Sequence, residues 1–374
     1  PKDLVAHYNM ALMLNKLDRK KESILVYEYV IRKNKLHWQS RFNLHLIYFK
    51  QKKYKKCLIL INDVLDINPN YNPAIREKAN IYLQQNKLTY ALKIIEAYKK
   101  LDSKDQIGIN IEGLIYLKLG EFENAKNILL GGHAIYPQYV PILINLASCY
   151  RSLNKPKEAV ESLKKVLKIS SNFFEALINL GAILIENGKY KEGVKYLEKA
   201  QKIDDDDVVN LNLGIGNFFL EDYKKAEKFF KISQNINPKN NLLNKNYSSL
   251  LLYKQNYKQA WKLYNKRIDF ENLSNLNSYF NKIQKKISMP ENLNKKDKIL
   301  LIKEEGVGDE ILYSSMYKEI IKLYPDILIE SDKRLIEIFK RSFNKKNNFI
   351  PYKKISDSKN INKIDKIIFS GNLP

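Results

Sequence analysis

The stretch A-L-I-N-L-G-A-I-L-I-E-N-G-K-Y-K-E-G-V-K-Y-L-E-K-A, residues 176–200, carries the pattern that decides the fold. Its first half places apolar residues mostly at three- and four-residue steps, as on the buried face of an α-helix. A short polar turn (N-G-K, residues 187–189) follows, and a second helical periodicity occupies residues 190–200. The stretch therefore predicts a pair of antiparallel helices joined by a tight turn.

Small residues repeat this unit along the chain with a period of 34 residues, once shortened to 33. One series lies in the second helix of each pair, and the other lies twelve residues upstream in the first helix. The second-helix series is Ser23, Cys57, Ala91, Ala125, Ala159, Gly193, Ala226 and Ala260. The first-helix series is Ala11, His45, Ala79, Gly113, Ala147, Gly181, Gly214 and Ser248. We expect eight helix pairs over residues 1–270, in which the small residues let the two helices approach closely.

Prolines stand at three of the unit boundaries, where a helix must end: Pro69, Pro137 and Pro238. The period, the small residues and these prolines together resemble the tetratricopeptide repeat (TPR). The resemblance implies a mainly α-helical, right-handed α-solenoid with an extended concave face, in which each unit is stable only against its neighbours. His45 and Ser248 depart from the usual small apolar residue, and Gly132 weakens the second helix of the fourth unit.

The residue two positions before each first-helix small residue is Asn in six of the eight units. In chain order these residues are Asn9, Asn43, Glu77, Ile111, Asn145, Asn179, Asn212 and Asn246. An Asn amide offers two donors and one acceptor, so a row of them along a groove could bind the backbone of an extended peptide. A similar row lines the repeats of the O-linked N-acetylglucosamine transferases.

Two interpretations of this row stay open. The amides are either part of the repeat consensus, with a structural use, or a groove that binds a protein or peptide partner. Because Glu77 and Ile111 interrupt the row, the run from Asn145 to Asn246 is the better candidate groove.

The composition excludes several classes of protein. A chain with 44% hydrophobic residues can form a core, two cysteines cannot hold a disulfide scaffold, and no apolar run approaches the roughly 20 residues of a membrane span. The net charge of +24 comes from 57 Lys and only 8 Arg, spread at similar density along the chain. We expect a diffuse Lys-coated surface rather than a nucleic-acid site, which more often gathers its charge and uses Arg.

Metal binding is also not favoured. The four histidines lie in different units without the spacing of metal ligands. The acidic run at residues 204–207 could suggest a hard cation, but it falls directly before a helix, where carboxylates cap free N–H groups. We therefore expect helix capping there and no metal site.

The pattern changes after the repeats. Residues 271–297 read as a linker, and residues 298–374 alternate short apolar runs with helical segments. Strands are expected at residues 298–303, 327–329, 349–351 and 366–369, and helices at residues 310–324 and 335–343. This alternation predicts a parallel sheet covered by helices, a Rossmann-type α/β domain.

The loop E-E-G-V-G-D (residues 304–309) follows the first of these strands. Gly306 and Gly308 would permit a tight turn and let a ligand come close to the backbone, while the following helix N-terminus would suit a phosphate or an oxyanion. Asp309 is expected at the rim, outside the carboxyl end of the strand. A helix cap at Asp309 explains the same residues of the loop equally well.

The end of the repeats, A-W-x-x-Y-x-x-R (residues 260–267), followed by this loop, resembles a family of bacterial TPR proteins that continue into a glycosyltransferase-like domain. The resemblance implies the acceptor-side half of a GT-B fold, as in the lipopolysaccharide heptosyltransferases, with Asp309 as candidate general base. Residues 370–374 resemble the loop of that family that precedes the second half. Glu305 stands where Gln is commoner, which places a negative charge beside the expected ligand.

The resemblance implies a nucleotide-sugar donor bound by a second half that this chain lacks, and hence a fragment that is inactive alone. Pro1 and Pro374 suggest a chain cut at both ends, and the bacterial family suggests the cytoplasm. The hypothesis for the gene is thus a TPR scaffold coupled to a glycosyltransferase. A non-catalytic peptide-binding scaffold is the alternative, and nucleic-acid binding is the least favoured.

Overall fold

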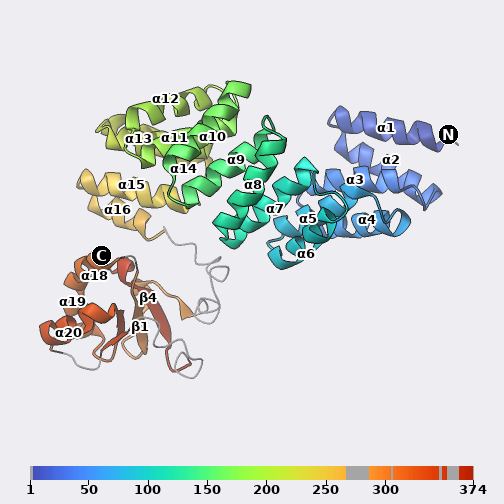
Figure 1. Ribbon diagram of the computed structural model, residues 1–374. Helices are drawn as coiled ribbons and strands as arrows, with labels where there is room; N and C mark the ends of the chain where they lie inside the picture. The colour runs from blue at the N-terminus through green and yellow to red at the C-terminus, as the bar shows by residue number, and fades with distance from the viewer. Residues whose placement is uncertain (1–2, 267–285, 305, 345–347, 352–361, 374) are drawn as a thin grey trace. The chain divides into compact units, whose positions relative to one another are not determined.

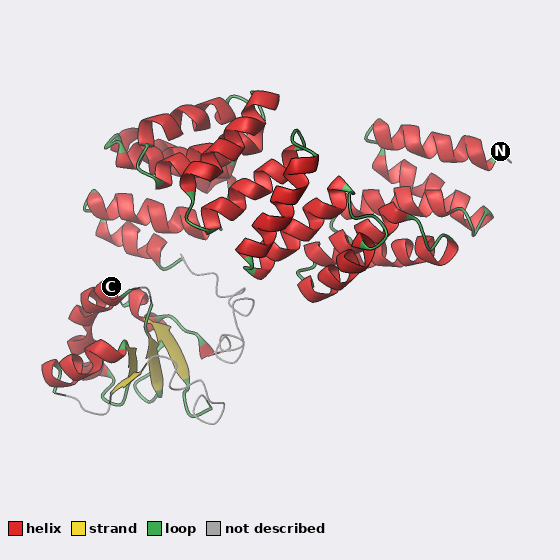
Figure 2. Ribbon diagram, viewed as in Figure 1, coloured by secondary structure: helices red, strands yellow, loops and turns green. Residues whose placement is uncertain are grey.

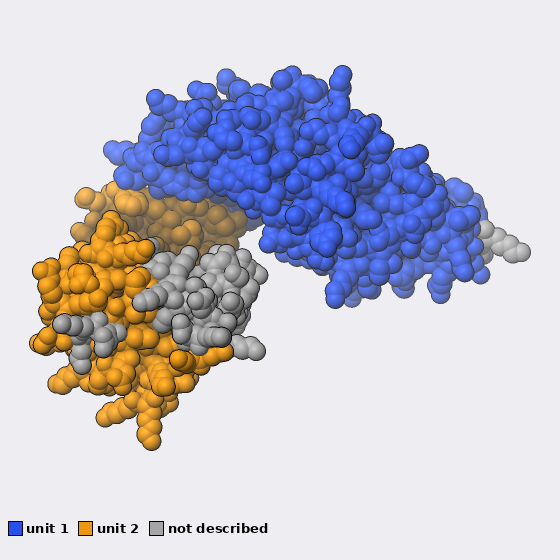
Figure 3. Space-filling view, turned by 60° about the horizontal axis from the view of Figure 1, so that its bottom comes forward, with its two compact units in different colours: residues 1–204 blue, residues 205–374 orange. Residues whose placement is uncertain are grey.

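The computed structural model describes residues 3–266, 286–304, 306–344, 348–351 and 362–373 (Figure 1). Paired helices make up the first of these ranges, and the strands lie in the remaining ones (Figure 2). The chain divides into two compact units, residues 1–204 and 205–374 (Figure 3). This division falls inside the repeat array, whereas most of the linker predicted at residues 271–297 lies outside the described residues.

The first unit contains twelve described helices that pair in sequence order. They are α1 (Leu4–Lys16), α2 (Lys20–Lys33), α3 (Trp38–Lys50), α4 (Tyr54–Ile67), α5 (Asn72–Gln84), α6 (Leu88–Lys99), α7 (Gln106–Leu119), α8 (Phe122–Ile135), α9 (Val140–Ser152), α10 (Pro156–Ile169), α11 (Phe174–Glu186) and α12 (Tyr190–Gln201). The second unit contains α13 (Asp207–Phe219), α14 (Tyr223–Ile236), α15 (Asn241–Tyr253) and α16 (Tyr257–Tyr264). The eight predicted helix pairs are confirmed within these residues.

Small residues let the two helices of a pair come together, as predicted. The alanines of the second-helix series are fully buried. In the α11–α12 pair, a Cβ atom added to Gly181 would lie 2.6 Å from Leu197 Cγ and 3.0 Å from the Gly193 carbonyl oxygen. No side chain fits at that distance without a shift of the backbone, so this pair requires glycine at the crossing.

The turn inside each pair places one residue in the left-handed conformation. Its φ angle lies between 55° and 79° in all eight pairs of the described array. The eight residues are Asp18, Lys52, Asn86, Gly120, Asn154, Gly188, Glu221 and Gln255. The next residue donates its N–H back into the first helix, as in the 2.8 Å bond from Lys189 to Leu184 O, which ends that helix in a Schellman-type cap.

The last part of the second unit is a four-stranded sheet. Its strands are β1 (Ile299–Ile302), β2 (Leu328–Ser331), β3 (Phe349–Pro351) and β4 (Lys366–Phe369), and all neighbouring pairs are parallel in the order β3-β2-β1-β4. Leu300 pairs with Leu328 on one side and with Ile367 on the other. The four expected strands and their parallel arrangement are confirmed.

The helices of this part are α18 (Val307–Tyr313), α19 (Tyr317–Leu323) and α20 (Lys333–Ser342), with a 3₁₀ turn at Ser314–Met316. The single helix expected over residues 310–324 is therefore interrupted. Ile311 and Leu312 are exposed, and the buried face instead carries Glu310, Tyr313 and Tyr317 at helical spacing. A charged residue, Glu310, thus lies on the buried face.

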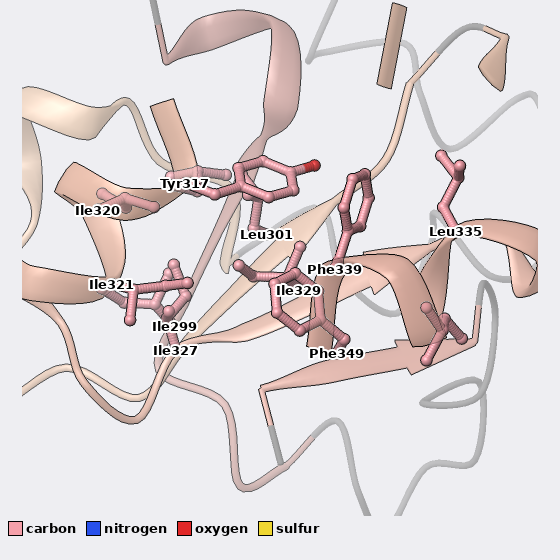
Figure 4. Packing of buried hydrophobic residues seen from close by; sticks show 12 residues of the cluster. Ile299, Leu301, Tyr317, Ile320, Ile321, Ile327, Ile329, Leu335, Phe339 and Phe349 are labelled. Atoms are coloured by element: carbon pink, nitrogen blue, oxygen red, sulfur yellow. The ribbon is translucent and has the colours of Figure 1, made fainter. Parts of the chain in front are cut away.

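The core of the sheet forms where the helices cover one of its faces (Figure 4). Leu301 of β1 and Ile329 of β2 are fully buried there. The ring of Tyr317 lies 5.6 Å from that of Phe339 and 6.1 Å from that of Phe349, so an aromatic cluster joins α19, α20 and β3. Aromatic pairs at these distances stabilise a core beyond the area that they bury.

Candidate functional site

The predicted row of amides lies on the first helices of the pairs, which we call the amide row. In the first unit, Asn43 donates to Tyr8 Oη at 2.9 Å and to its own helix at Gln39 O at 3.0 Å. Asn145 donates to Asn110 Oδ1 at 2.7 Å, which joins α9 to α7. The row therefore follows the face on which successive first helices adjoin, while Asn9 is exposed and Asn179 half-buried.

In the second unit, both members of the row bond to their own helices. Asn212 donates to Val208 O at 2.9 Å, and Asn246 donates to Leu242 O at 2.8 Å. An amide has two donors and an acceptor, so such a bond orients the side chain and leaves a second N–H and the oxygen for a ligand. The geometry is thus compatible with both interpretations of the row, the structural one and the peptide-binding one.

The two interruptions of the row are different in kind. Ile111 is buried, and Asn110, one residue earlier, supplies the amide that meets Asn145. Sequence reasoning missed Asn110, although a second Asn directly beside a broken position was a usable signal. Glu77 faces His45, with 3.8 Å between Oε2 and Nε2, so two departures from the repeat pattern pair with each other.

In the α/β part, the loops after β1 and β4 meet. The Glu304 backbone N–H donates to Ser370 Oγ at 3.2 Å, and the Gly371 N–H donates to Glu304 Oε2 at 2.8 Å. These loops lie at the carboxyl ends of the two strands where the strand order reverses, the position at which open parallel sheets bind ligands. The structure thus brings residues 370–373 beside the start of the glycine loop, whereas Glu305 lies outside the described residues.

Asp309 and Glu310 have opposite orientations. Asp309 is exposed, and its carboxylate accepts the Gly306 N–H at 3.2 Å, which caps α18. Glu310 is fully buried and accepts the Asp332 N–H at 3.1 and 3.2 Å, with Lys303 Nζ 3.4 Å away. Glu310 therefore links the ends of β1 and β2, a structural role that the sequence reasoning did not assign.

The two glycines of the loop do not make a strained turn. Gly306 has a φ of −86° and a ψ of 178°, and neither glycine has a positive φ. The backbone at Gly306 does not use the positive φ that glycine alone readily adopts, because any residue adopts this conformation. A Cβ atom on Gly308 would meet no atom within 4 Å, so open space remains at the start of α18.

The acidic run at residues 204–207 caps α13, as predicted. Asp206 Oδ1 accepts the Val209 N–H at 2.7 Å, and Asp207 Oδ2 accepts the side-chain amides of Asn237 and Asn240 at 2.9 and 3.0 Å. Within the described residues, no three His, Cys, Asp or Glu side chains gather as metal ligands would. No helix in the described part of the chain has the length and apolar character needed to cross a bilayer.

Comparison with known proteins finds a repeat in part of the chain. Residues 151–211 match a family model described as a tetratricopeptide repeat. The coatomer subunit epsilon of Dictyostelium discoideum is 26% identical over 204 residues, which is 43% of this chain and 66% of that protein, just under two thirds of its length.

Solved structures show the same fold. A tetratricopeptide repeat protein from Parabacteroides merdae ATCC 43184 superposes with a TM-score of 0.51 at 14% identity, over 64% of this chain and 96% of the other. The APC/C hetero-tetramer Cut9–Hcn1 gives a TM-score of 0.56 at 12% identity, over 66% of this chain and 49% of the other. The helix pairs, their small residues and these matches agree: residues 151–211 carry a tetratricopeptide repeat, and the helix pairs have the fold of tetratricopeptide-repeat proteins, followed by a small parallel sheet near the C-terminus.

Proposed function

We propose that the chain is a protein-interaction scaffold whose amide row binds the backbone of an extended peptide. The observation that carries the proposal is the recurrence of Asn at one position of six first helices, of which Asn43 and Asn145 bond to the neighbouring first helix of the first unit. Amides that bond to the backbone of a peptide do not contact its side chains, so the binding would depend little on the peptide's sequence. The coatomer relative, by its name a subunit of an assembly, supports a role in protein contacts.

The test uses the purified chain and a fluorescein-labelled unstructured peptide of about 20 residues. One variant replaces Asn145 and Asn179 with Ala, and another replaces Asn212 and Asn246. Each interfacial hydrogen bond contributes about 0.5–1.5 kcal/mol, so the loss of two should weaken binding about 5- to 150-fold in each double variant. Asn62→Ala, at an exposed position of α4, is the matched control.

A peptide with Pro at every second position adds an independent readout, because it lacks half of the backbone N–H donors. The proposal predicts weaker binding of this peptide to the unchanged chain. Equal affinity for both peptides, or a loss with Asn62→Ala as large as with the row variants, would contradict binding through the amide row.

A second candidate function is glycosyl transfer by a longer protein that contains this chain. It is supported by the meeting of the loops after β1 and β4, because residues 304–309 and 370–374 are those that resemble the glycosyltransferase family. A nucleotide sugar would be the donor, and the Asp309 carboxylate, exposed at the rim, would take the proton of the acceptor hydroxyl. The bond from the Gly306 N–H engages Oδ2, so the proton would go to the other carboxylate oxygen, Oδ1.

Two substitutions in the protein with its natural C-terminal continuation separate the roles of Asp309. Asp309→Asn keeps an oxygen that can cap α18 but cannot act as a base, whereas Asp309→Ser caps without a comparable charge. If Asp309 is the general base, both variants should lower the rate of transfer from a nucleotide-sugar donor by about 10²- to 10⁴-fold, while the stability of the protein stays unchanged. Transfer that survives in either variant would leave Asp309 as a cap only.

A further inference from the structure

A groove runs between α2 and α4, the second helices of the first two pairs, and we call it the α2–α4 groove. Its volume is about 580 Å³, and Leu44 of α3 lies at its floor. Ile31 and Leu60 contribute to its walls. The volume falls within the range of clefts that bind ligands, roughly 300–1,000 Å³. The groove lies on second helices, whereas the amide row lies on first helices.

The walls carry two large apolar side chains that face solvent. Leu25 is 64% exposed and Ile59 is 62% exposed. Both stand two residues after the small residue of their second helix, and the other six repeats have polar or charged residues there. Those residues are Lys93, Asn127, Glu161, Lys195, Lys228 and Lys262. An apolar residue at this surface position therefore occurs only in the two adjacent repeats that form the groove.

Covering these side chains would be favourable. Burial of a Leu or Ile side chain contributes about 1.5–3 kcal/mol, so this pair alone could supply much of the affinity of a transient complex. Nothing in the repeat pattern requires an apolar residue at this position, since six units do without one. The two side chains are thus better explained by a partner than by the fold.

The charges of the groove indicate which partner fits. Glu28 is exposed and is the one acidic residue among those that line the groove, and its Oε1 accepts a hydrogen bond from Tyr48 Oη at 3.2 Å. Arg32 and Lys56 line the groove as well, and Lys56 Nζ lies 4.9 Å from the centre of the Tyr48 ring. By position in their repeats these cations are ten residues apart, about 15 Å along a helix axis. The groove thus presents an apolar centre between two cationic ends.

We propose that the α2–α4 groove binds an amphipathic helix of another protein, with apolar anchors in its middle and acidic residues toward its ends. Two helices side by side leave a furrow that a third helix fills with side chains at i, i+3, i+4 and i+7. A helix of about ten residues spans about 15 Å, which places its two acidic ends opposite Arg32 and Lys56. The net charge of +24 favours the same acidic partner at a distance.

The test measures fluorescence anisotropy with a labelled peptide of about 15 residues that has Leu at i, i+3, i+4 and i+7 and Glu at both ends. Leu25→Glu together with Ile59→Glu should raise the Kd at least about tenfold, as loss of an anchor does. Leu101→Glu, at a 62% exposed position outside the groove, is the matched control and should leave the Kd unchanged. Because all three positions are exposed, the helical content should stay constant by circular dichroism.

The charge part is tested with Arg32→Glu and Lys56→Glu and with a second peptide in which Lys replaces the Glu ends. The proposal predicts that the unchanged chain prefers the acidic peptide and that the charge-reversed chain prefers the basic one. No binding of either peptide, or equal binding by the Leu25/Ile59 variant, would overturn it. Self-association of the chain that disappears in that variant would also overturn it, because the occupant would then be a second copy.

Discussion

The pairing of His45 with Glu77 leads to the most specific prediction about stability. His45 is fully buried, and its Nδ1 contacts the Phe42 carbonyl oxygen, a group that only accepts, so Nδ1 carries a proton. Its Nε2 lies 3.8 Å from Glu77 Oε2, whose side chain is 19% exposed. Asn80 donates to the same carboxylate at 3.2 Å. His45 and Glu77 thus form an ion pair between the second and third repeats when Nε2 is also protonated.

The distance sets the size of the effect. Two unit charges at 3.8 Å interact by about 4 kcal/mol at an effective dielectric constant near 20. The cost of removing both groups from water offsets most of this energy, which leaves a coupling of about 1–2 kcal/mol. His45→Ala alone should cost about 2–4 kcal/mol, because it also removes a ring from a fully buried site.

A double-mutant cycle isolates this coupling. The variants are His45→Ala, Glu77→Asn and the two together, which introduce residues that other repeats of the array have at these positions. The free energy of unfolding is measured with urea by circular dichroism, and hydrogen exchange of α3 and α5 amides locates the change. We expect the double variant to be more stable than the sum of the single losses by about 1–2 kcal/mol at pH 5.5.

The carboxylate adds a test at low pH. Burial raises the pKa of Glu77, but interactions with His45 and Asn80 and the charge of Arg76 outweigh it, so the pKa lies below its ordinary value of 4.5. The ionised carboxylate therefore contributes stability above pH 4.5 that is lost as the pH falls through the folded-state pKa. The deficit of Glu77→Asn relative to the unchanged chain should shrink below pH 4.5. Additive single losses at pH 5.5, or a deficit independent of pH, would refute the pairing.

Three further predictions concern single positions in the repeats. Gly131→Ala should raise the free energy of unfolding, measured with urea, by about 0.5–1 kcal/mol, because the added Cβ meets no atom within 4 Å. Gly132→Ala should lower it by about 1–3 kcal/mol, because the added Cβ would lie 2.7 Å from two isoleucine side chains. Lys52→Gly should raise the thermal midpoint, since Lys52 has a φ of 56° that costs a non-glycine residue about 1 kcal/mol. Burial raises the pKa of Cys57 to about 11 and that of Cys149 to about 12, so both thiols should react with dithionitrobenzoate at pH 8 only after unfolding.

The helix pairs could be predicted from sequence because their cause is periodic. Each pair needs a small residue where its helices cross, and the eightfold repetition of that need made the signal stronger than any local propensity. The strands of the α/β part could be predicted because short apolar runs alternate with helical segments. The burial of Glu310 could not be predicted, because Glu310 looks like a surface residue until the ends of β1 and β2 lie beside it.

The candidate sites were less predictable, because a site depends on which residues meet. The sequence marked His45 as a departure from one series and Glu77 as a gap in another, but only the packing of α3 against α5 joins them. It left open whether Asp309 is a site residue or a helix cap, and in the structure this exposed carboxylate accepts the Gly306 N–H as a cap. Sequence alone also does not show that the backbone at Gly306 is extended and allowed to any residue, so that this position does not use a positive φ.

A repeat array supplies its own reference for judging a residue, because eight copies of each position perform the same structural task. A residue shared by most copies, such as the Asn of the amide row, either serves that task or belongs to a binding site to which several copies contribute. A residue that departs from the other copies needs a local reason. His45 has one in Glu77, which lies inside the fold. Leu25 and Ile59 depart together, face solvent and line one groove, so their reason must lie outside the described fold. On this argument the α2–α4 groove is the more informative of the two surfaces, although the amide row has more members.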